Sequence, residues 1–331
     1  MSNSTLSILH TYNQRMIMFN QPCEMFSNGV QGHAVTIPSG NPKNYHQALS
    51  MPEDIPEISI DGQLFMPASG NPCAVIILVP GSLGVAPSHL GHAETFTNMG
   101  IAACVIDPFG ARRVTSTVAN QSQYSFAASA WDVLATANYL GNLEAIDNKR
   151  IGAQGHSRGG SAVLSAANAT FSRAFNQPVL SAVYSAYPWC GQQFLNPDTG
   201  STVVRAVIGD RDEWCLPQQV QGHIHAIQVS GGQASIKIFA EAQHSFDRGT
   251  AIEFIPDAAI SPGAPTCYID NTGAFIHPIT NKANASLCDR ELMIYGLKAG
   301  YGKKGAHLGS KDNQAQDFRA DMISFWEHNL N

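Results

Sequence analysis

Residues 150–160, RIGAQGHSRGG, carry the most informative pattern in the chain. An apolar run ends in Gly155, a serine follows at position 157, and Gly159 comes two residues later. A strand, a sharp turn and a helix starting near Arg158 would place Ser157 in the strained turn called a nucleophile elbow. Glycines on both sides remove Cβ atoms that would clash there. The stretch therefore predicts an α/β fold that exposes Ser157; a tight structural turn is the alternative.

The rest of the chain alternates between patterns of buried strands and of helices. Continuous apolar runs predict strands at 73–80, 101–108, 150–155, 179–188, 202–210 and 234–242, and helix patterns lie at 125–141, 157–168 and 314–330. This alternation predicts a mainly parallel sheet with helices on both faces. The stretch 56–67, PEISIDGQLFMP, alternates around an Asp-Gly pair, which predicts a hairpin or two short edge strands.

Length and composition indicate one large globular domain. The chain has 331 residues, of which 44% are hydrophobic and 13% charged, enough to bury a sizeable core. We expect this domain at 51–331, after a polar N-terminal extension at 1–50. Residues from about 250 to 310 are rich in Gly, Pro and Asn, which predicts an elaborated loop region within the domain.

Charge and hydropathy limit the classes of partner. The net charge is −6 and Lys and Arg form no run, so we expect no nucleic-acid binding. No apolar stretch approaches the ~20 residues of a membrane-spanning helix. The N-terminus lacks the basic start and long apolar run of a signal peptide, which favours a cytoplasmic location. A small-molecule substrate is the expected partner, and the oligomeric state stays open.

Cysteines and histidines give no pattern of a metal site. None of the seven cysteines forms a CxxC pair. Bridging of Cys190 with Cys215, or of Cys267 with Cys288, is left open. The closely spaced histidines, His89 with His92 and His223 with His225, lack the H-E-x-x-H spacing. We expect neither a catalytic metal nor a cofactor.

An activated serine needs a base and an acid that orients the base. In this architecture the acid and then the histidine follow the serine, each after a strand. Asp210 and Asp212 come just after the predicted strand 202–210, and His244 follows the next one. Both positions lie at the carboxyl ends of strands, where open α/β sheets bind their ligands.

Two backbone N–H groups are expected to stabilise an anion formed at Ser157. The first belongs to Arg158, at the N-terminus of the predicted helix, where the helix dipole is positive. The second comes from the small-residue loop in LVPGSLGV (78–85), at Ser82 or Leu83. A plain strand-to-helix turn is the alternative interpretation of this loop.

Five motifs in the same order resemble the dienelactone hydrolase family of α/β hydrolases. They are VIDPFGARRVTST (105–117), GHSRGG (155–160), AYPWC (186–190), GDRDEWCLP (209–217) and AQHSFD (242–247). The similarity runs from about residue 55 to 250 and implies the α/β-hydrolase fold. The family's acid lies in a G-x-x-D turn, which implies Asp212, and its histidine in an H-x-F setting, which implies His244.

The resemblance also implies a reaction class. The enzyme that names the family uses a cysteine nucleophile and a glutamate in the first oxyanion loop, whereas this chain has Ser157 and a loop without a carboxylate, Gly81-Ser82-Leu83. A serine hydrolase that cleaves a small ester or lactone through an acyl-enzyme is therefore expected. An acyltransferase or lyase with the same triad, or a non-catalytic binding protein on this scaffold, are the alternatives.

Three further residues are candidates for substrate binding. Arg112 matches an arginine that follows Phe-Gly in related sequences and would pair with a substrate carboxylate; a structural ion pair is the alternative. Trp189 and Trp214 each follow a strand predicted to lead into the site and would line an acyl or alcohol pocket, or serve only as core or rim aromatics.

Overall fold

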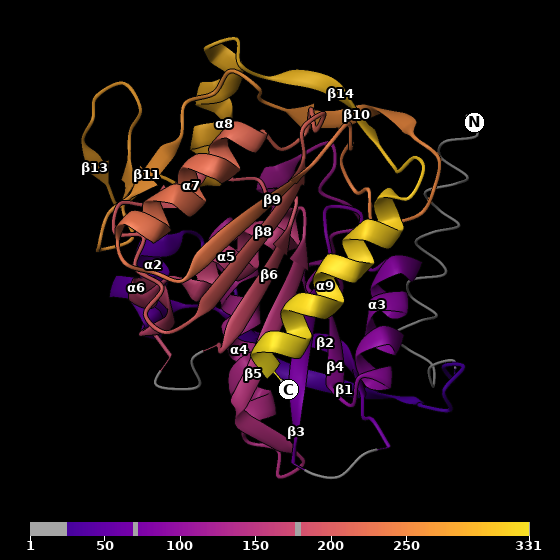
Figure 1. Ribbon diagram of the computed structural model, residues 1–331. Helices are drawn as coiled ribbons and strands as arrows, with labels where there is room; N and C mark the ends of the chain where they lie inside the picture. Colours follow the sequence, from indigo (N-terminus) through magenta and orange to yellow (C-terminus); the bar gives the residue numbers. More distant parts are fainter. Residues whose placement is uncertain (1–24, 69–71, 176–179, 331) are drawn as a thin grey trace.

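A mostly parallel sheet forms the centre of the protein (Figure 1). The computed structural model describes residues 25–68, 72–175 and 180–330. Over these residues the main sheet has eight strands in the order β1-β2-β4-β3-β5-β6-β8-β9. From β4 to β9 all neighbours are parallel, while β1 and β2 are antiparallel additions at one edge. The strands are β1 (Gly32–Gly40), β2 (Glu57–Phe65), β3 (Cys73–Val79), β4 (Ala102–Asp107), β5 (Ile146–His156), β6 (Ala182–Ala186), β8 (Val203–Gly209) and β9 (Ala234–Phe239).

The central strands are buried on both faces, as their continuous apolar runs predict. Every residue of β3 and β4 is buried. Parallel strands are joined by helical crossovers that cover both faces of the sheet, so successive side chains all meet packed neighbours. The predicted α/β-hydrolase fold, with its mainly parallel sheet and flanking helices, is confirmed.

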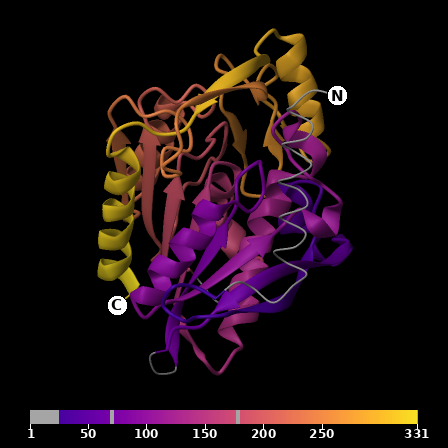
Figure 2. The same ribbon diagram turned by 90° about the vertical axis from the view of Figure 1, so that its right-hand side faces the viewer.

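Helices form a layer on each side of the sheet (Figure 2). Helices α3 and α9 share one face, where the Phe96 and Trp326 rings meet with centroids 6.2 Å apart. Helices α4 and α5 pack together on the other face. The helices are α2 (Tyr45–Ser50), α3 (Pro87–Asn98), α4 (Phe126–Gly141), α5 (Arg158–Ala167), α6 (Ala169–Ser172), α7 (Pro217–Val229), α8 (Asp289–Lys298) and α9 (Gln314–Leu330). None of the described helices combines the length and apolar character that a membrane crossing requires.

The antiparallel edge differs from the sequence prediction. Residues Glu57–Phe65 of the stretch 56–67 form one continuous strand, β2, rather than a hairpin or two short edge strands, and Asp61-Gly62 lies inside it. Strand β2 pairs with β4 on one side and β1 on the other, which holds it straight. A Cβ at Gly62 would lie 3.2 Å from the Val105 carbonyl oxygen, so the glycine permits a close approach here. Strand β1 comes from the segment assigned to the N-terminal extension, whose first 24 residues lie outside the described part.

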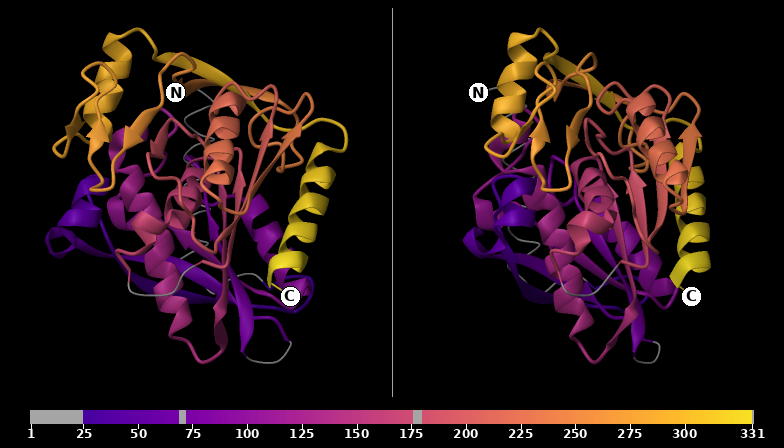
Figure 3. Two further views of the ribbon diagram at one scale, coloured as in Figure 1. Left: turned by 60° about the vertical axis from the view of Figure 1, so that its left-hand side comes forward. Right: turned by 90° about the vertical axis from the view of Figure 1, so that its left-hand side faces the viewer.

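Residues 253–308 form a cap over the carboxyl ends of the strands (Figure 3). The cap consists of α8, an antiparallel pair of β10 with β14, and three short strands that join β7 in a second small sheet. These strands are β7 (Gln192–Phe194), β10 (Glu253–Ile260), β11 (Cys267–Ile269), β12 (Phe275–Ile276), β13 (Ala283–Asn284) and β14 (Lys303–Leu308). The Gly- and Pro-rich region at 250–310 is thus an ordered addition to the sheet.

The cysteines of the described part, from Cys73 to Cys288, are all free thiols. Neither Cys190 with Cys215 nor Cys267 with Cys288 forms a bridge, and Cys23 lies outside the described residues. The described part of the fold is therefore held together by noncovalent contacts.

Helix α9 is anchored by one side chain. Trp326 is fully buried, and its Nε1 donates a 2.9 Å hydrogen bond to Gln154 Oε1 in β5. A Cβ at Gly152 would lie 2.4 Å from the Trp326 ring, so the indole lies directly on the backbone of β5. The C-terminal helix thereby supports the strand that leads to Ser157.

Replacement of Trp326 by alanine is expected to lower the free energy of unfolding by about 3–5 kcal/mol, because it leaves a cavity between α9 and β5. Urea denaturation followed by circular dichroism measures the change. Glu327→Ala, at the next and exposed position of the helix, is the control and should change stability by less than about 0.5 kcal/mol. A loss below about 1 kcal/mol for Trp326→Ala would contradict this packing.

Candidate active site

Ser157 occupies a strained turn between β5 and α5. Strand β5 ends at His156 and the helix begins at Arg158. Ser157 has φ 56° and ψ −115°, a region that non-glycine residues rarely adopt. Its N–H donates a 2.9 Å hydrogen bond to the Ala186 carbonyl at the end of β6, which holds the turn in place. The local geometry is that of a nucleophile elbow.

The two flanking glycines are required by close backbone contacts. A Cβ at Gly155 would lie 2.0 Å from the Gly159 carbonyl oxygen. A Cβ at Gly159 would lie 2.3 Å from the Val79 carbonyl oxygen. Any larger residue at either position would push α5 away from the sheet. The glycines therefore set both the angle of the turn and the depth at which the helix starts.

A continuous chain of hydrogen bonds joins Ser157, His244 and Asp212. Ser157 Oγ lies 2.9 Å from His244 Nε2, and His244 Nδ1 lies 2.8 Å from Asp212 Oδ2. The other oxygen of Asp212 accepts hydrogen bonds from the N–H groups of Trp214 (2.9 Å) and Cys215 (2.8 Å). The side chains of Ser157, His244 and Asp212 are all buried. Asp210, the other carboxylate of this turn, is exposed and lies outside the hydrogen-bond chain.

The loop after β3 lies directly over Ser157. A Cβ at Gly81 would lie 3.2 Å from the Ser157 Cβ, and Ser82 and Leu83 line a cavity together with Ser157. The Ser82 carbonyl accepts a 2.8 Å hydrogen bond from the N–H of Thr117. The structure thus brings both predicted loop residues to the serine, beside the N-terminus of α5.

The Arg158 side chain supports the wall of the site. Its guanidinium donates to the carbonyl oxygens of Gln121 (2.8 Å) and Tyr124 (2.7 Å) and to Ser129 Oγ (3.2 Å). It also stacks on the Tyr124 and Phe126 rings, 4.2 and 4.1 Å from their centroids. These contacts fix the chain before α4, while the Arg158 backbone remains at the helix N-terminus beside Ser157.

The structure places Arg112 in a buried ion pair away from the serine. Its Nη1 and Nη2 bind the two oxygens of Asp132 at 2.7 and 3.1 Å. The remaining N–H groups donate to Asn41 Oδ1 and to the carbonyls of Pro108 and Gly40. All five donors are therefore used, and Arg112 lines neither cavity that reaches Ser157. The structural ion pair, which the sequence left as the alternative, is the observed arrangement.

A large cavity leads from Ser157 to the cap. It encloses about 1480 Å³, part of which is open to solvent. Trp189 and Trp214 both line it, and Phe126 packs beside Trp189 with ring centroids 4.9 Å apart. The Trp214 ring also lies 5.0 Å from the His244 ring, so this wall is continuous with the hydrogen-bond chain.

A second cavity, of about 320 Å³, meets the first at the serine. Ser82, Ser157 and Trp214 line both cavities, whereas His244 and Leu83 line only the smaller one. Ser157 is therefore reached from two sides.

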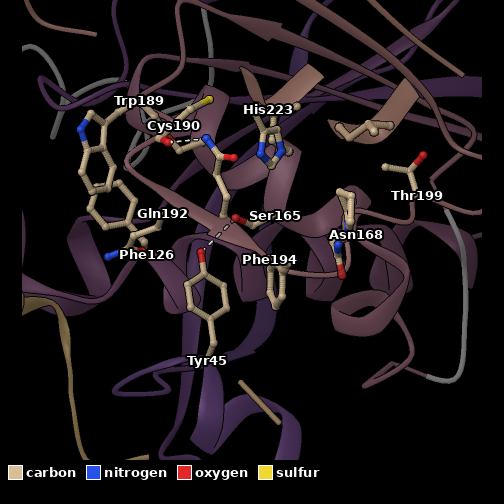
Figure 4. A pocket seen from close by; sticks show the side chains of 15 residues that line it. Tyr45, Phe126, Ser165, Asn168, Trp189, Cys190, Gln192, Phe194, Thr199 and His223 are labelled. Carbon is tan, nitrogen blue, oxygen red and sulfur yellow. Dashed lines mark hydrogen bonds between the residues drawn. The ribbon is translucent and has the colours of Figure 1, made fainter. Parts of the chain in front are cut away.

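A third cavity lies behind α5 (Figure 4). It contains buried polar atoms without a hydrogen-bond partner in the described part of the chain, namely Gln192 Oε1, Thr199 Oγ1 and His223 Nδ1. Burial lowers the pKa of His223 to about 4, so its ring is neutral at neutral pH. Phe126 and Trp189 stand between this cavity and the large one.

Buried polar groups support the site from below. Asp247 accepts hydrogen bonds from the Tyr187 hydroxyl (2.6 Å) and His92 Nε2 (3.0 Å), and the Tyr187 ring packs edge-on against His244, 4.8 Å between centroids. His156 Nε2 lies 3.7 Å from the same carboxylate. The ligand atoms of His92, His156 and Asp247 lie within 4.8 Å of one another, close enough for these residues to hold a metal ion.

A free thiol lies beside the hydrogen-bond chain. Cys215 Sγ is within 4.8 Å of ligand atoms of Asp212 and His244. Burial raises the pKa of this thiol well above its usual range. Because only the thiolate is strongly nucleophilic, Cys215 is a neutral neighbour of Ser157 rather than a competing nucleophile.

Helix α8 and the residues that it contributes to the large cavity were not predicted from the sequence. Leu292, Met293 and Leu297 line it from this helix. Residues 289–298, DRELMIYGLK, carried a usable signal, because acidic residues in the first turn and a lysine in the last favour a helix. The Gly, Pro and Asn residues on both sides of this segment favoured a loop prediction for the whole region.

Comparisons with known proteins show the family and the fold of the chain. The model of the dienelactone hydrolase family matches residues 60–260. No curated protein matches the chain. An esterase from Pyrobaculum calidifontis is similar to the chain in structure, with a TM-score of 0.51 and 14% identity over 75% of this chain and 86% of that one. This likeness concerns the fold.

Two further solved structures are less similar. A dienelactone hydrolase-like promiscuous phosphotriesterase from metagenomic libraries has a TM-score of 0.47 and 13% identity, covering 82% of this chain and 100% of that one. The esterase Est1E from Butyrivibrio proteoclasticus, with ferulic acid bound, has a TM-score of 0.44 and 17% identity, covering 56% of this chain and 88% of that one.

Replacement of Arg112 by alanine is expected to lower the free energy of unfolding by about 3–5 kcal/mol, because it leaves the buried Asp132 carboxyl without its cationic partner. The KM of the folded enzyme for a neutral ester should not change. Urea denaturation and initial-rate kinetics measure the two quantities, with the exposed Arg173→Ala as the control. Unchanged stability with a raised KM would instead assign Arg112 to substrate binding.

His223 is expected to make the fold sensitive to acid. Between pH 6.5 and pH 4 the unfolded chain binds a proton at this histidine and the folded chain does not, so stability falls as the pH falls, by up to ~3 kcal/mol. His223→Leu should therefore lose less stability than the wild type between pH 7 and pH 4.5 in urea titrations. His225→Leu, on the exposed side of α7, is the control. Equal losses in the wild type and in His223→Leu would show that His223 is charged in the folded protein.

Proposed function

The chain belongs to the dienelactone hydrolase family and is a hydrolase of ester bonds, and we propose that it cleaves a carboxylic ester or lactone with Ser157 as nucleophile. The observation that carries this proposal is the unbroken hydrogen-bond chain from Ser157 Oγ through His244 to Asp212, with links of 2.9 and 2.8 Å. A family member of this kind acts on a small-molecule substrate.

In the proposed reaction Ser157 Oγ attacks the carbonyl carbon while His244 Nε2 takes the serine proton. Asp212 keeps the Nδ1 hydrogen of His244 in place, so that Nε2 is the basic nitrogen, and it stabilises the imidazolium that forms. The N–H donors of Trp214 and Cys215 hold the Asp212 carboxylate in this orientation. Collapse of the tetrahedral intermediate releases the alcohol and leaves an acyl-enzyme, which water activated by His244 then hydrolyses.

The negative charge of the tetrahedral intermediate needs hydrogen-bond donors beside the serine. We assign this role to the backbone N–H of Arg158 together with that of Ser82 or Leu83. The N-terminus of α5 supports the assignment, because its first N–H groups have no partner within the helix and the helix dipole is positive there. The close contact of Gly81 with Ser157 supports the contribution of the loop.

Trp189 and Trp214 are proposed to contact the substrate. Both line the large cavity, which begins at Ser157. The guanidinium groups of Arg112 and Arg158 are both occupied: Arg112 binds Asp132, and Arg158 binds backbone carbonyls. This arrangement favours hydrolysis of a neutral ester over recognition of a substrate carboxylate at either arginine.

Ser157→Ala is expected to lower kcat by about 10⁴- to 10⁶-fold, since it removes the nucleophile, while the fold stays intact. Turnover of p-nitrophenyl acetate and butyrate measures the rate. Intact mass after exposure to a fluorophosphonate should show one adduct on the wild type and none on the variant. Ser165→Ala, in the same helix with its hydroxyl bonded to Tyr45, is the control and should keep both activity and adduct. A wild type that takes no adduct and hydrolyses neither ester would overturn the proposal.

A further inference from the structure

The two cavities that meet at Ser157 differ in size and in lining. The larger encloses about 1480 Å³ and the smaller about 320 Å³, and in each case part of the volume is open to solvent. The large cavity therefore offers room for a bulky substituent, whereas the small one can receive only a compact group.

The far wall of the large cavity is apolar and comes from the cap. Ile260, from β10, and Leu292, Met293 and Leu297, from α8, line this cavity together with Trp189 and Trp214. Leu292 and Met293 are half-buried at this wall. Apolar and aromatic side chains on facing walls favour an apolar ligand, because contact with them removes its surface from water.

Charged residues of the large cavity are few and already engaged or exposed. Asp289 accepts hydrogen bonds from Gln192 Nε2 (2.5 Å) and from the N–H of Phe126 (2.8 Å). Arg158 is held by carbonyl oxygens, as described above. Lys303 and Lys304, at the start of β14, are exposed to solvent. The apolar wall at α8 therefore suits an uncharged part of a ligand.

The position of His244 assigns one side of the ester to each cavity. His244 Nε2 must give its proton to the oxygen of the leaving alcohol, so the alcohol leaves on the side of this ring. Of the two cavities that contain Ser157, only the small one is lined by His244. The acyl group, which stays bound to Ser157 Oγ, then extends into the large cavity beneath the cap.

We propose that the enzyme prefers esters of a bulky, apolar, uncharged acyl group with a small alcohol. This inference rests on the proposed function and adds the substrate class. In the reaction, a bond forms between Ser157 Oγ and the carbonyl carbon as the serine proton moves to His244. The bond to the alcohol oxygen breaks, and this oxygen takes that proton. Water then adds to the carbonyl carbon of the acyl-enzyme and gives one of its protons to His244; the bond to Ser157 Oγ breaks, Oγ takes this proton, and the carboxylic acid is released.

A pair of isomeric esters tests the proposal directly. Methyl hexanoate and pentyl acetate have the same formula but carry the long chain on opposite sides of the ester bond. Release of acid in a pH-stat gives kcat/KM for both and for methyl acetate. Each methylene that enters an apolar site contributes at most ~0.8 kcal/mol, or about a fourfold gain in kcat/KM. We expect a gain of at least about tenfold from methyl acetate to methyl hexanoate, and less than about threefold from methyl acetate to pentyl acetate.

A substitution in the cap provides the second measurement. Met293→Trp fills the cavity and should reduce the ratio of kcat/KM for methyl hexanoate to kcat/KM for methyl acetate by about tenfold. Ile294→Trp places the same side chain at the next position of α8, which is exposed and outside the cavity lining, and should leave this ratio unchanged. The comparison of isomers in the wild type stands even if Met293→Trp does not fold.

The outcomes separate this inference from the proposed function. Suppose that Ser157 takes the fluorophosphonate adduct, but kcat/KM rises from methyl acetate to pentyl acetate as much as it rises to methyl hexanoate, or rises to neither. The acyl assignment is then wrong and the serine hydrolase proposal stands. If no ester is hydrolysed and no adduct forms, the proposed function fails and the acyl assignment fails with it.

Discussion

The backbone of Ser157 is the constraint on which the rest of the site depends. A positive φ at a serine costs of order 1–3 kcal/mol of conformational free energy, and contacts with the surrounding structure must offset this cost. Two contacts do so: the start of α5 lies so close to β3 and β5 that only glycine fits at positions 155 and 159, and the serine N–H is bonded to the end of β6. Three neighbouring strands thus hold one residue in a conformation it would not adopt alone. The Ser157 hydroxyl and the N–H groups at the start of α5 are oriented as a consequence.

Parallel strands extend this constraint to the partners of the serine. Strands β5, β6 and β8 are adjacent, and β9 follows β8, so the loops after all four strands emerge at one edge of the sheet. His244 comes from the loop after β9 and Asp212 from the loop after β8. The N–H groups of Trp214 and Cys215 then fix the Asp212 carboxylate, and Tyr187 packs against the His244 ring. The distances of 2.8 and 2.9 Å follow from this arrangement of loops, each held by its own backbone contacts.

The sequence predicted those parts of the molecule that are set by local rules. The apolar run at 73–80 appears as the buried strand β3, and the glycines around Ser157 mark the turn that needs them. The pairing of segments that are distant in the sequence could not be predicted from local patterns. The Asp-Gly pair at 61–62 has the same pattern in a turn as in a straight strand, and only pairing with β1 and β4 decides between them. For Arg112 the sequence pattern was compatible with a substrate carboxylate or with a structural ion pair, and in the folded protein Arg112 pairs with Asp132.

The cap is connected to the part of the chain that carries Ser157, Asp212 and His244 at one point. Ser157, Asp212 and His244 all lie within the matched range 60–260, whereas α8 and β14 lie beyond it. The two parts nevertheless meet at one point: Leu308, at the end of β14, is bridged to His244, and the N–H of Gly309 donates a 2.8 Å hydrogen bond to the His244 carbonyl. The base of the cap is therefore anchored on the backbone of the histidine itself. Any movement of β14 relative to the sheet would act on the His244 loop, so the cap and the His244 ring are positioned by the same contacts.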